Sequence, residues 1–208
     1  MKRRVAYDVA PLGEEFFALL VCAIFFLAGI VVGTFSARSL DEVGTLALRA
    51  SMSVYIDQII AGTAGSPSFW FVLWANGRTP LLVLFLGFSL LGAPVLPVVA
   101  GVRGFYLSFS IAAFIRAFGI GGWPLAFALF GVGALITVPC FFLLASQAFR
   151  ASTHLGRGAL TAGKIQVGML YGRAYWTRTG LCAVLIVVAV LVELYVAPIL
   201  VVVASSFL

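Results

Sequence analysis

The sequence predicts an all-α integral membrane protein: a polytopic helical bundle of about five transmembrane helices, with one external amphipathic helix. Apolar residues make up 63% of the chain and charged residues 10%, whereas a soluble domain has about half and about a quarter. The apolar residues also gather in runs that approach the ~20 residues needed to cross a bilayer. The surplus apolar surface must therefore face lipid, and we expect residues 1–208 to form a single transmembrane domain.

The first predicted span covers residues 16–36 and ends just before Arg38. This run is too long for the apolar core of a signal peptide, which predicts that it is retained as a membrane span. Gly29 and Gly33 lie within it at the spacing that allows the backbone of another helix to approach closely. We therefore expect this pair to lie at a helix–helix contact.

Residues 39–60 differ from the spans because charged and apolar side chains alternate along them. That spacing is typical of an amphipathic helix on the membrane surface or against the bundle. Ser39 and Glu42 have the spacing of a capping box, which predicts where this helix starts. Aromatic residues at the membrane interface are expected after it, at Phe69, Trp70 and Trp74.

The remaining predicted spans are 80–100, 104–118, 123–148 and 179–203. The second of the five contains prolines in its latter half, so we expect a kink or a break there. The third is short for a full crossing and carries Arg116 near its end. The positions that we expect to break helices or to pack them closely are Gly29, Gly33, Gly92, Pro94, Pro97, Gly104, Pro139 and Pro198.

The positions of the basic residues predict the orientation of the chain. Cytoplasmic segments of membrane proteins are enriched in Lys and Arg. A cytoplasmic N-terminus and an external C-terminus leave Arg38, Arg49 and Arg78 outside. The same orientation places nine basic residues inside, which are Lys2, Arg3, Arg4, Arg103, Arg150, Arg157, Lys164, Arg173 and Arg178. We therefore predict a multi-pass protein of the cell membrane in this orientation.

The chain carries little that could perform catalysis. It has no GxSxG, HExxH or phosphate-binding loop, and its single histidine, His154, lies in a basic segment that we expect to be a loop. The three cysteines lie in separate apolar runs without a CxxC pair, so no metal site is indicated. We expect no enzymatic activity and no cofactor. The basic residues at the ends of spans indicate topology rather than nucleic-acid binding.

Glu193 is the one acidic residue well inside an apolar run. A carboxylate in hydrocarbon is costly and usually faces the bundle with a partner. One interpretation is a proton or ion site. The other, which we favour, is a structural hydrogen bond to a backbone group, or a pair with Arg116 or another polar residue.

The chain is similar to the stage II sporulation protein M family of bacterial membrane proteins. The resemblance rests on FFL with Gly29 and Gly33 in the first span, LFLG through LGAP over 84–94, GVRGF over 101–105, and VELYVAP over 192–198. It implies a role in spore formation, in the mother-cell membrane during engulfment. It also implies stage II sporulation proteins D and P, which degrade cell wall, as partners that the protein anchors or localises.

The sequence is therefore consistent with two functions. The first is a non-enzymatic scaffold of a peptidoglycan-remodelling complex. The second is a subunit of a membrane transporter or channel, with Glu193 and the proline-containing second span lining a path. The sequence offers few intramembrane polar residues and no inverted repeat for the second. Membrane lipid is an expected partner, and the sequence is compatible with a homo-oligomer.

Overall fold

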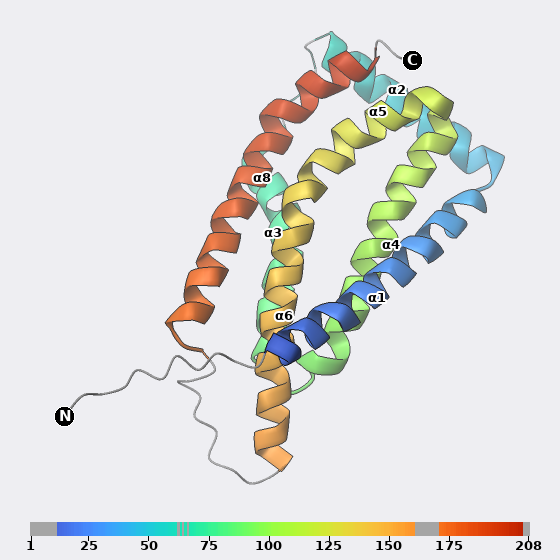
Figure 1. Ribbon diagram of the computed structural model, residues 1–208. Coiled ribbons are helices and arrows are strands. Elements are labelled where there is room, and N and C mark those ends of the chain that lie inside the picture. Colours follow the sequence, from blue (N-terminus) through green and yellow to red (C-terminus); the bar gives the residue numbers. More distant parts are fainter. Residues whose placement is uncertain (1–11, 62, 64, 66, 161–170, 206–208) are drawn as a thin grey trace.

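The computed structural model describes residues 12–61, 63, 65, 67–160 and 171–205. Within these residues all regular structure is helical, and the helices stand side by side as an elongated bundle (Figure 1). A 3₁₀ turn over Gly119–Gly121 and a π-helical turn over Phe127–Gly131 interrupt the α-helices. The α-helices are α1 (Leu12–Arg38), α2 (Glu42–Ile60), α3 (Phe69–Gly87), α4 (Gly92–Phe118), α5 (Gly122–Ala126), α6 (Val132–Leu160) and α8 (Arg173–Ser205).

Four stretches of the described chain are long and apolar enough to cross a membrane: Glu15–Arg38, Phe69–Gly87, Gly92–Ala159 and Arg173–Ala204. The third of these contains both α4 and α6, which are joined by the turn at Gly119–Gly121, by α5 and by the π-helical turn. The protein is thus an all-α polytopic membrane bundle, and the predicted fold class is confirmed.

The two ends of the bundle are named here by the helices that form them. The α2 end comprises α2, the Gly119–Gly121 turn and the last turns of α8, where Ile56, Phe114 and Val201 belong to one buried cluster. The α6 end comprises the Phe88–Leu91 turn, the last turns of α6 and the first turn of α8. The chain enters α1 at the α6 end and leaves α8 at the α2 end (Figure 1).

The predicted second and third spans are wrong in their boundaries. Their place is taken by α3, which ends at Gly87, and by α4, which runs unbroken from Gly92 to Phe118. Pro94 lies in the first turn of α4, where a backbone N–H has no helical acceptor to lose. Pro97 lies further along α4 and removes only one backbone hydrogen bond of the helix. The two prolines therefore follow the start of a helix rather than break one, and the apparent shortness of the third span disappears.

The predicted fourth span is too short, because α6 continues twelve residues past the predicted end at Ala148 to Leu160. Residues 149–160, which follow the predicted span, are therefore helical, and His154 lies in α6 rather than in the predicted loop. Residues 161–170 of the predicted loop lie outside the described residues. Helix α6 is long because its last turns pack small residues such as Ala151 and Ser152 against the bundle.

Helix α2 forms over the predicted segment, but its start differs from the predicted capping box. Asp41 is the N-cap, with extended backbone angles (φ −67°, ψ 156°), and its Oδ1 accepts a hydrogen bond from the Glu42 N–H at 2.8 Å. Ser39 instead bonds back to the carbonyl of Phe35. The cap is therefore the acidic residue that directly precedes the helix, as expected for the residue whose side chain can reach the first N–H groups.

Candidate functional site: polar and close-packed contacts in the bundle

Glycines bring α1 and α4 into backbone contact. A Cβ on Gly29 would overlap the carbonyl oxygen of Gly101, and one on Gly104 would overlap the carbonyl oxygen of Phe26. Gly33 lies equally close to the backbone of Phe105. The predicted packing positions Gly29, Gly33 and Gly104 thus meet across one interface. Close approach of this kind replaces hydrophobic driving force with dispersion contact, as is typical between helices in lipid.

At the α6 end, Ser152 holds the turn between α3 and α4. Its Oγ donates to the carbonyl of Ser89 and accepts from the N–H of Ala93, both at 2.7 Å, and the side chain is only 1% exposed. Gly92 is required in this turn because a Cβ there would overlap the carbonyl oxygen of Leu86. The hydroxyl therefore satisfies backbone groups that the turn leaves without helical partners.

Tyr171, which precedes α8, also contacts the turn between α3 and α4. Its hydroxyl donates to the Gly87 carbonyl at 3.0 Å, and its ring packs against Phe88 with centroids 4.9 Å apart. Burial raises the pKa of Tyr171 above the ordinary value for a tyrosine. The hydroxyl is thus kept protonated, in the form that can donate the bond.

Glu15 links three helices at the same end. It forms an ion pair with Arg150 of α6, and Arg178 of α8 approaches the same carboxylate oxygen at 3.4 Å. The α6 end is consequently joined by a carboxylate on α1, a serine on α6 and an aromatic cluster before and within α8. None of these three contacts was predicted from the sequence.

The Glu193 carboxylate has a partner, and it is not Arg116. Asn76 Nδ2 on α3 donates to Glu193 Oε2 on α8 at 2.7 Å, and also to the carbonyl of Val72 on its own helix at 3.1 Å. Gly133 of α6 lies beside the same carboxylate. Arg116 donates instead to the carbonyl of Arg38, so the suggested Glu193–Arg116 pair is wrong. Glu193 on α8 and Arg116 on α4 therefore have different hydrogen-bond partners.

The height of Glu193 in the bundle bears on its role. Along α8, Glu193 lies about 27 Å from Tyr175 at the α6 end, taking ~1.5 Å per residue. Because α8 extends from Arg173 to Ser205, Glu193 lies only ~6 Å past the midpoint of the helix, on the side of the α2 end. A carboxylate inside the bundle needs a hydrogen-bond donor, and the amide of Asn76 supplies one.

Arg103 is a residue that the sequence analysis misplaced. It was assigned to a cytoplasmic loop between spans, but it lies in the middle of α4, with its guanidinium over the ring of Phe141 at 5.4 Å. Its buried Nε has no hydrogen-bond partner among the described residues, and neither polar atom of the buried Gln147 has one. A charged group within a membrane bundle is a signal that could have identified Arg103.

Pro139 and Pro198 lie inside α6 and α8, which continue through them. The π-helical turn Phe127–Gly131 comes directly before α6, and Gly133, which neighbours Glu193, follows it by two residues. Among the described residues, no group of three or more His, Cys, Asp or Glu could hold a metal ion. The polar side chains located here act mainly as ties between helices.

Comparison with known proteins adds the family. A family model described as stage II sporulation protein M matches residues 22–198, which is most of the chain. The match spans every helix that contributes to the contacts above, from Cys22 in α1 to Pro198 in α8. Searches of curated proteins and of solved structures gave no match.

Proposed function

Because the chain belongs to the stage II sporulation protein M family, we propose that this sporulation-related membrane protein is a non-enzymatic scaffold of a peptidoglycan-remodelling complex active in engulfment. Its partners would be wall-degrading proteins of the kind represented by stage II sporulation proteins D and P. The observation that carries the proposal is the use of the polar side chains. Asn76, Glu193 and Ser152 bond to one another or to backbone groups of neighbouring helices, which suits a rigid support.

The proposed orientation places the α6 end in the cytoplasm and the α2 end outside. At the α6 end, Arg150, Arg157, Arg173 and Arg178 outnumber the carboxylates of α1. Arg78, predicted to be external, lies instead in the middle of α3. The α2 end carries three arginines, Arg38, Arg49 and Arg116, and three carboxylates, Asp41, Glu42 and Asp57. This asymmetry follows the rule that basic residues gather on the cytoplasmic side. It would put α2 on the side where enzymes acting on the wall work.

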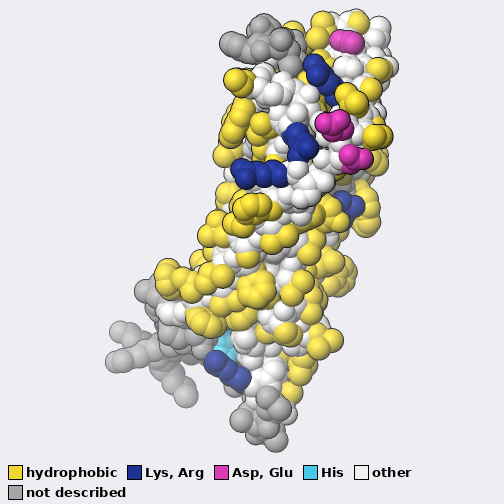
Figure 2. All heavy atoms as spheres, turned by 90° about the vertical axis from the view of Figure 1, so that its right-hand side faces the viewer, with side chains coloured by type: hydrophobic (Ala, Val, Ile, Leu, Met, Phe, Trp, Pro, Cys, Tyr) yellow, Lys and Arg dark blue, Asp and Glu magenta, His cyan; other side chains and the backbone are white. Residues whose placement is uncertain are grey.

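Helix α2 is the proposed partner surface. It buries little more than Ile56, whereas Val43 is 72% exposed and Leu46 is 64% exposed. Figure 2 shows acidic and basic side chains gathered at this end of the molecule, among hydrophobic ones, on the face that also carries α1 and α4. A helix with exposed apolar side chains between charged ones can dock a partner through its apolar positions and orient it through its charges.

The test is affinity purification from native membranes of sporulating cells. Leu46→Gln, alone and together with Val43→Ser, should reduce recovery of wall hydrolases several-fold while leaving the amount of inserted protein unchanged. The matched control is Gln58→Ala, an equally exposed change on the same helix. Unchanged recovery with the double variant, or equal loss with the control, would remove α2 as the partner surface.

A transporter subunit is the second candidate, favoured by one observation. A carboxylate, Glu193, lies beside a helix that begins with a π-helical turn, and such turns occur frequently at functional sites. The same purification separates the two functions, since solute-binding proteins in place of wall hydrolases would favour transport.

A further inference from the structure

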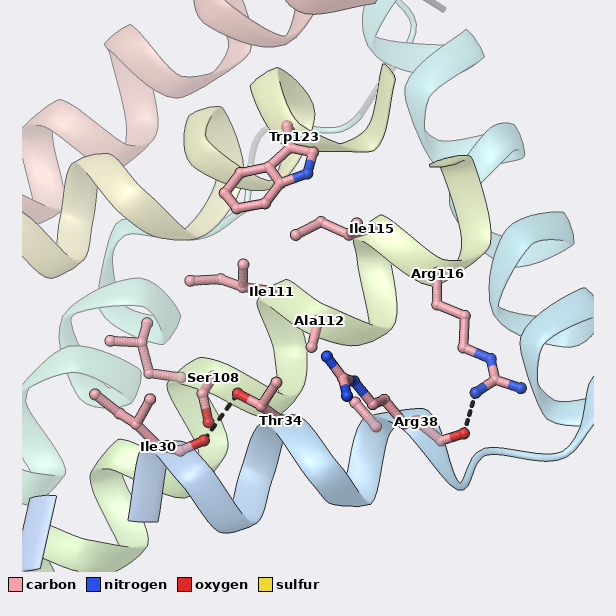
Figure 3. Close-up of a pocket in the computed structure, with 11 residues that line it drawn as sticks. Ile30, Thr34, Arg38, Ser108, Ile111, Ala112, Ile115, Arg116 and Trp123 are labelled. Carbon is pink, nitrogen blue, oxygen red and sulfur yellow. Dashed lines mark hydrogen bonds between the residues drawn. The ribbon is translucent and has the colours of Figure 1, made fainter. Parts of the chain in front are cut away.

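A groove opens between α1 and α4 near the α2 end, with a volume of about 630 Å³. Figure 3 shows its apolar wall, made by Ile30 on α1 and by Ile111 and Ile115 on α4, with Trp123 above. It begins beyond the glycine contact between the two helices, where small side chains such as Ala112 leave the space between them unfilled. The volume falls in the ~300–1,000 Å³ range of pockets that hold small ligands.

The two hydroxyl groups that line the groove already donate hydrogen bonds within the protein. Thr34 Oγ1 donates to the carbonyl of Ile30 at 2.8 Å, and Ser108 Oγ donates to the carbonyl of Phe105 at 3.1 Å. Each hydroxyl proton is therefore used within its own helix, and the interior of the groove is suited to hydrocarbon. The exposed neighbours Val31, Val32 and Phe35 on α1 continue this apolar surface outward.

Two arginines stand at the rim of the groove. Arg116 donates to the main-chain carbonyl of Arg38, which holds the two residues together, and both side chains are exposed. Figure 3 shows the Arg38 guanidinium turned toward Ala112, over the opening. Neither arginine forms an ion pair with a carboxylate in the part of the chain that the structure describes. Two guanidinium groups beside an apolar groove match a ligand with an anionic oxygen head and a hydrocarbon tail.

We propose that this groove binds an anionic phospholipid, with its phosphate on Arg38 and Arg116 and one acyl chain along the apolar wall. The occupant is a lipid because the groove is continuous with surface that faces hydrocarbon, so a chain from the bilayer enters it without crossing water. It is anionic because the rim carries two arginines that have no carboxylate partner among the described residues. The proposal is independent of the scaffold function and of its partners.

The experiment uses the full-length protein in detergent, titrated with phosphatidylglycerol or with phosphatidylcholine of the same chain length, and read by native mass spectrometry. Wild-type protein should retain phosphatidylglycerol about tenfold more tightly, because phosphatidylcholine has the same phosphate but also a choline cation that the two arginines repel. Glycerol 3-phosphate, which has the head without the tails, should not displace it. Equal retention of the two lipids, or displacement by glycerol 3-phosphate, would overturn the proposal.

Variants locate the site. Arg38→Gln should abolish most of the preference for phosphatidylglycerol, whereas Arg49→Gln on α2, an exposed arginine at the same end, should leave it unchanged. Ala112→Phe fills the groove and should weaken retention of both lipids. Arg38 is the primary test because its guanidinium makes no hydrogen bond that supports the fold among the described residues. Equal loss with Arg38→Gln and Arg49→Gln would show attraction by general charge and contradict a defined site.

Discussion

The two ends of the bundle are built differently. At the α6 end, Ser152 and Tyr171 bond to the α3–α4 turn, and the Glu15 ion pair joins α1 to α6. At the α2 end, a whole helix rests on the bundle while burying little beyond Ile56, and a groove lies open beside it. The α6 end is thus held by polar contacts between helices, whereas the α2 end leaves apolar side chains such as Val43 and Leu46 exposed.

The largest effect is expected between the two ends, where α1 meets α4. Gly29→Val should lower the free energy of unfolding by about 3 kcal/mol or more, because the added atoms overlap the Gly101 backbone, which cannot move aside. The measurement is thermal unfolding and folded yield in detergent. Gly180→Ala in α8 is the matched control, since a Cβ there meets nothing within 4 Å, and it should change stability by less than about 1 kcal/mol.

The next largest effect on stability is expected from a substitution at the α6 end. Ser152→Ala should cost about 1–3 kcal/mol, because the Ala93 N–H and the Ser89 carbonyl lose a buried partner. Ser51→Ala on α2 provides the comparison. Its hydroxyl is exposed and bonds only to its own helix, so little change is expected. Equal effects of the two substitutions in thermal unfolding would contradict the difference between the ends.

Substitutions of Glu193 test whether its hydrogen bond with Asn76 is structural. Glu193→Gln keeps an acceptor for Asn76 and should lose about 1 kcal/mol, whereas Glu193→Leu leaves the half-buried amide without it and should lose more. Cellular function should follow folded yield in both variants. A Gln variant that folds, reaches the membrane and yet has no function would instead favour a proton-coupled role and the transporter hypothesis.

The smallest effect concerns Tyr171 and alkaline pH. Its pKa is raised by burial, so the folded state holds the proton more tightly than the unfolded state, whose tyrosine ionises near pH ~10. The contribution of Tyr171 to stability is therefore complete below that pH and is lost as the pH rises through the raised pKa. Tyr171→Phe should lower the melting temperature by a few degrees at pH 8, and the difference should shrink above pH ~10. Tyr55→Phe, on the exposed surface of α2, should show neither effect.

Sequence reasoning succeeded where a feature depends on neighbouring residues. The apolar runs located α1 and α8, and the glycine spacing in α1 indicated a close contact. It failed at the α3–α4 turn, because Phe88 to Leu91 is itself largely apolar and hides the boundary. The signal was available in Gly87 and Gly92 with Pro94 two residues later, a helix end followed by a first-turn proline. Taking that turn as part of a span also moved Arg103 out of the bundle and into a loop.

Contacts between distant residues were not accessible from the sequence. Asn76 and Glu193 are 117 positions apart, and the residues around each of them give no indication that the two side chains meet. Asn76 lies within α3, where a single amide side chain gives no local indication of its partner. Ser152 was passed over for a similar reason, since a serine in an apparent loop carries no indication that it will close a turn between two other helices.

The central claim, that the α2 end is external and the α6 end cytoplasmic, is tested most directly by single-cysteine labelling of intact cells. In a background lacking Cys22, Cys140 and Cys182, Gln58→Cys reports the α2 end and Ala159→Cys reports the α6 end, since both positions are exposed. A membrane-impermeant maleimide should label Gln58→Cys in intact cells and Ala159→Cys only after permeabilisation. Labelling of Ala159→Cys from outside, with Gln58→Cys protected, would contradict the orientation and with it the external partner surface.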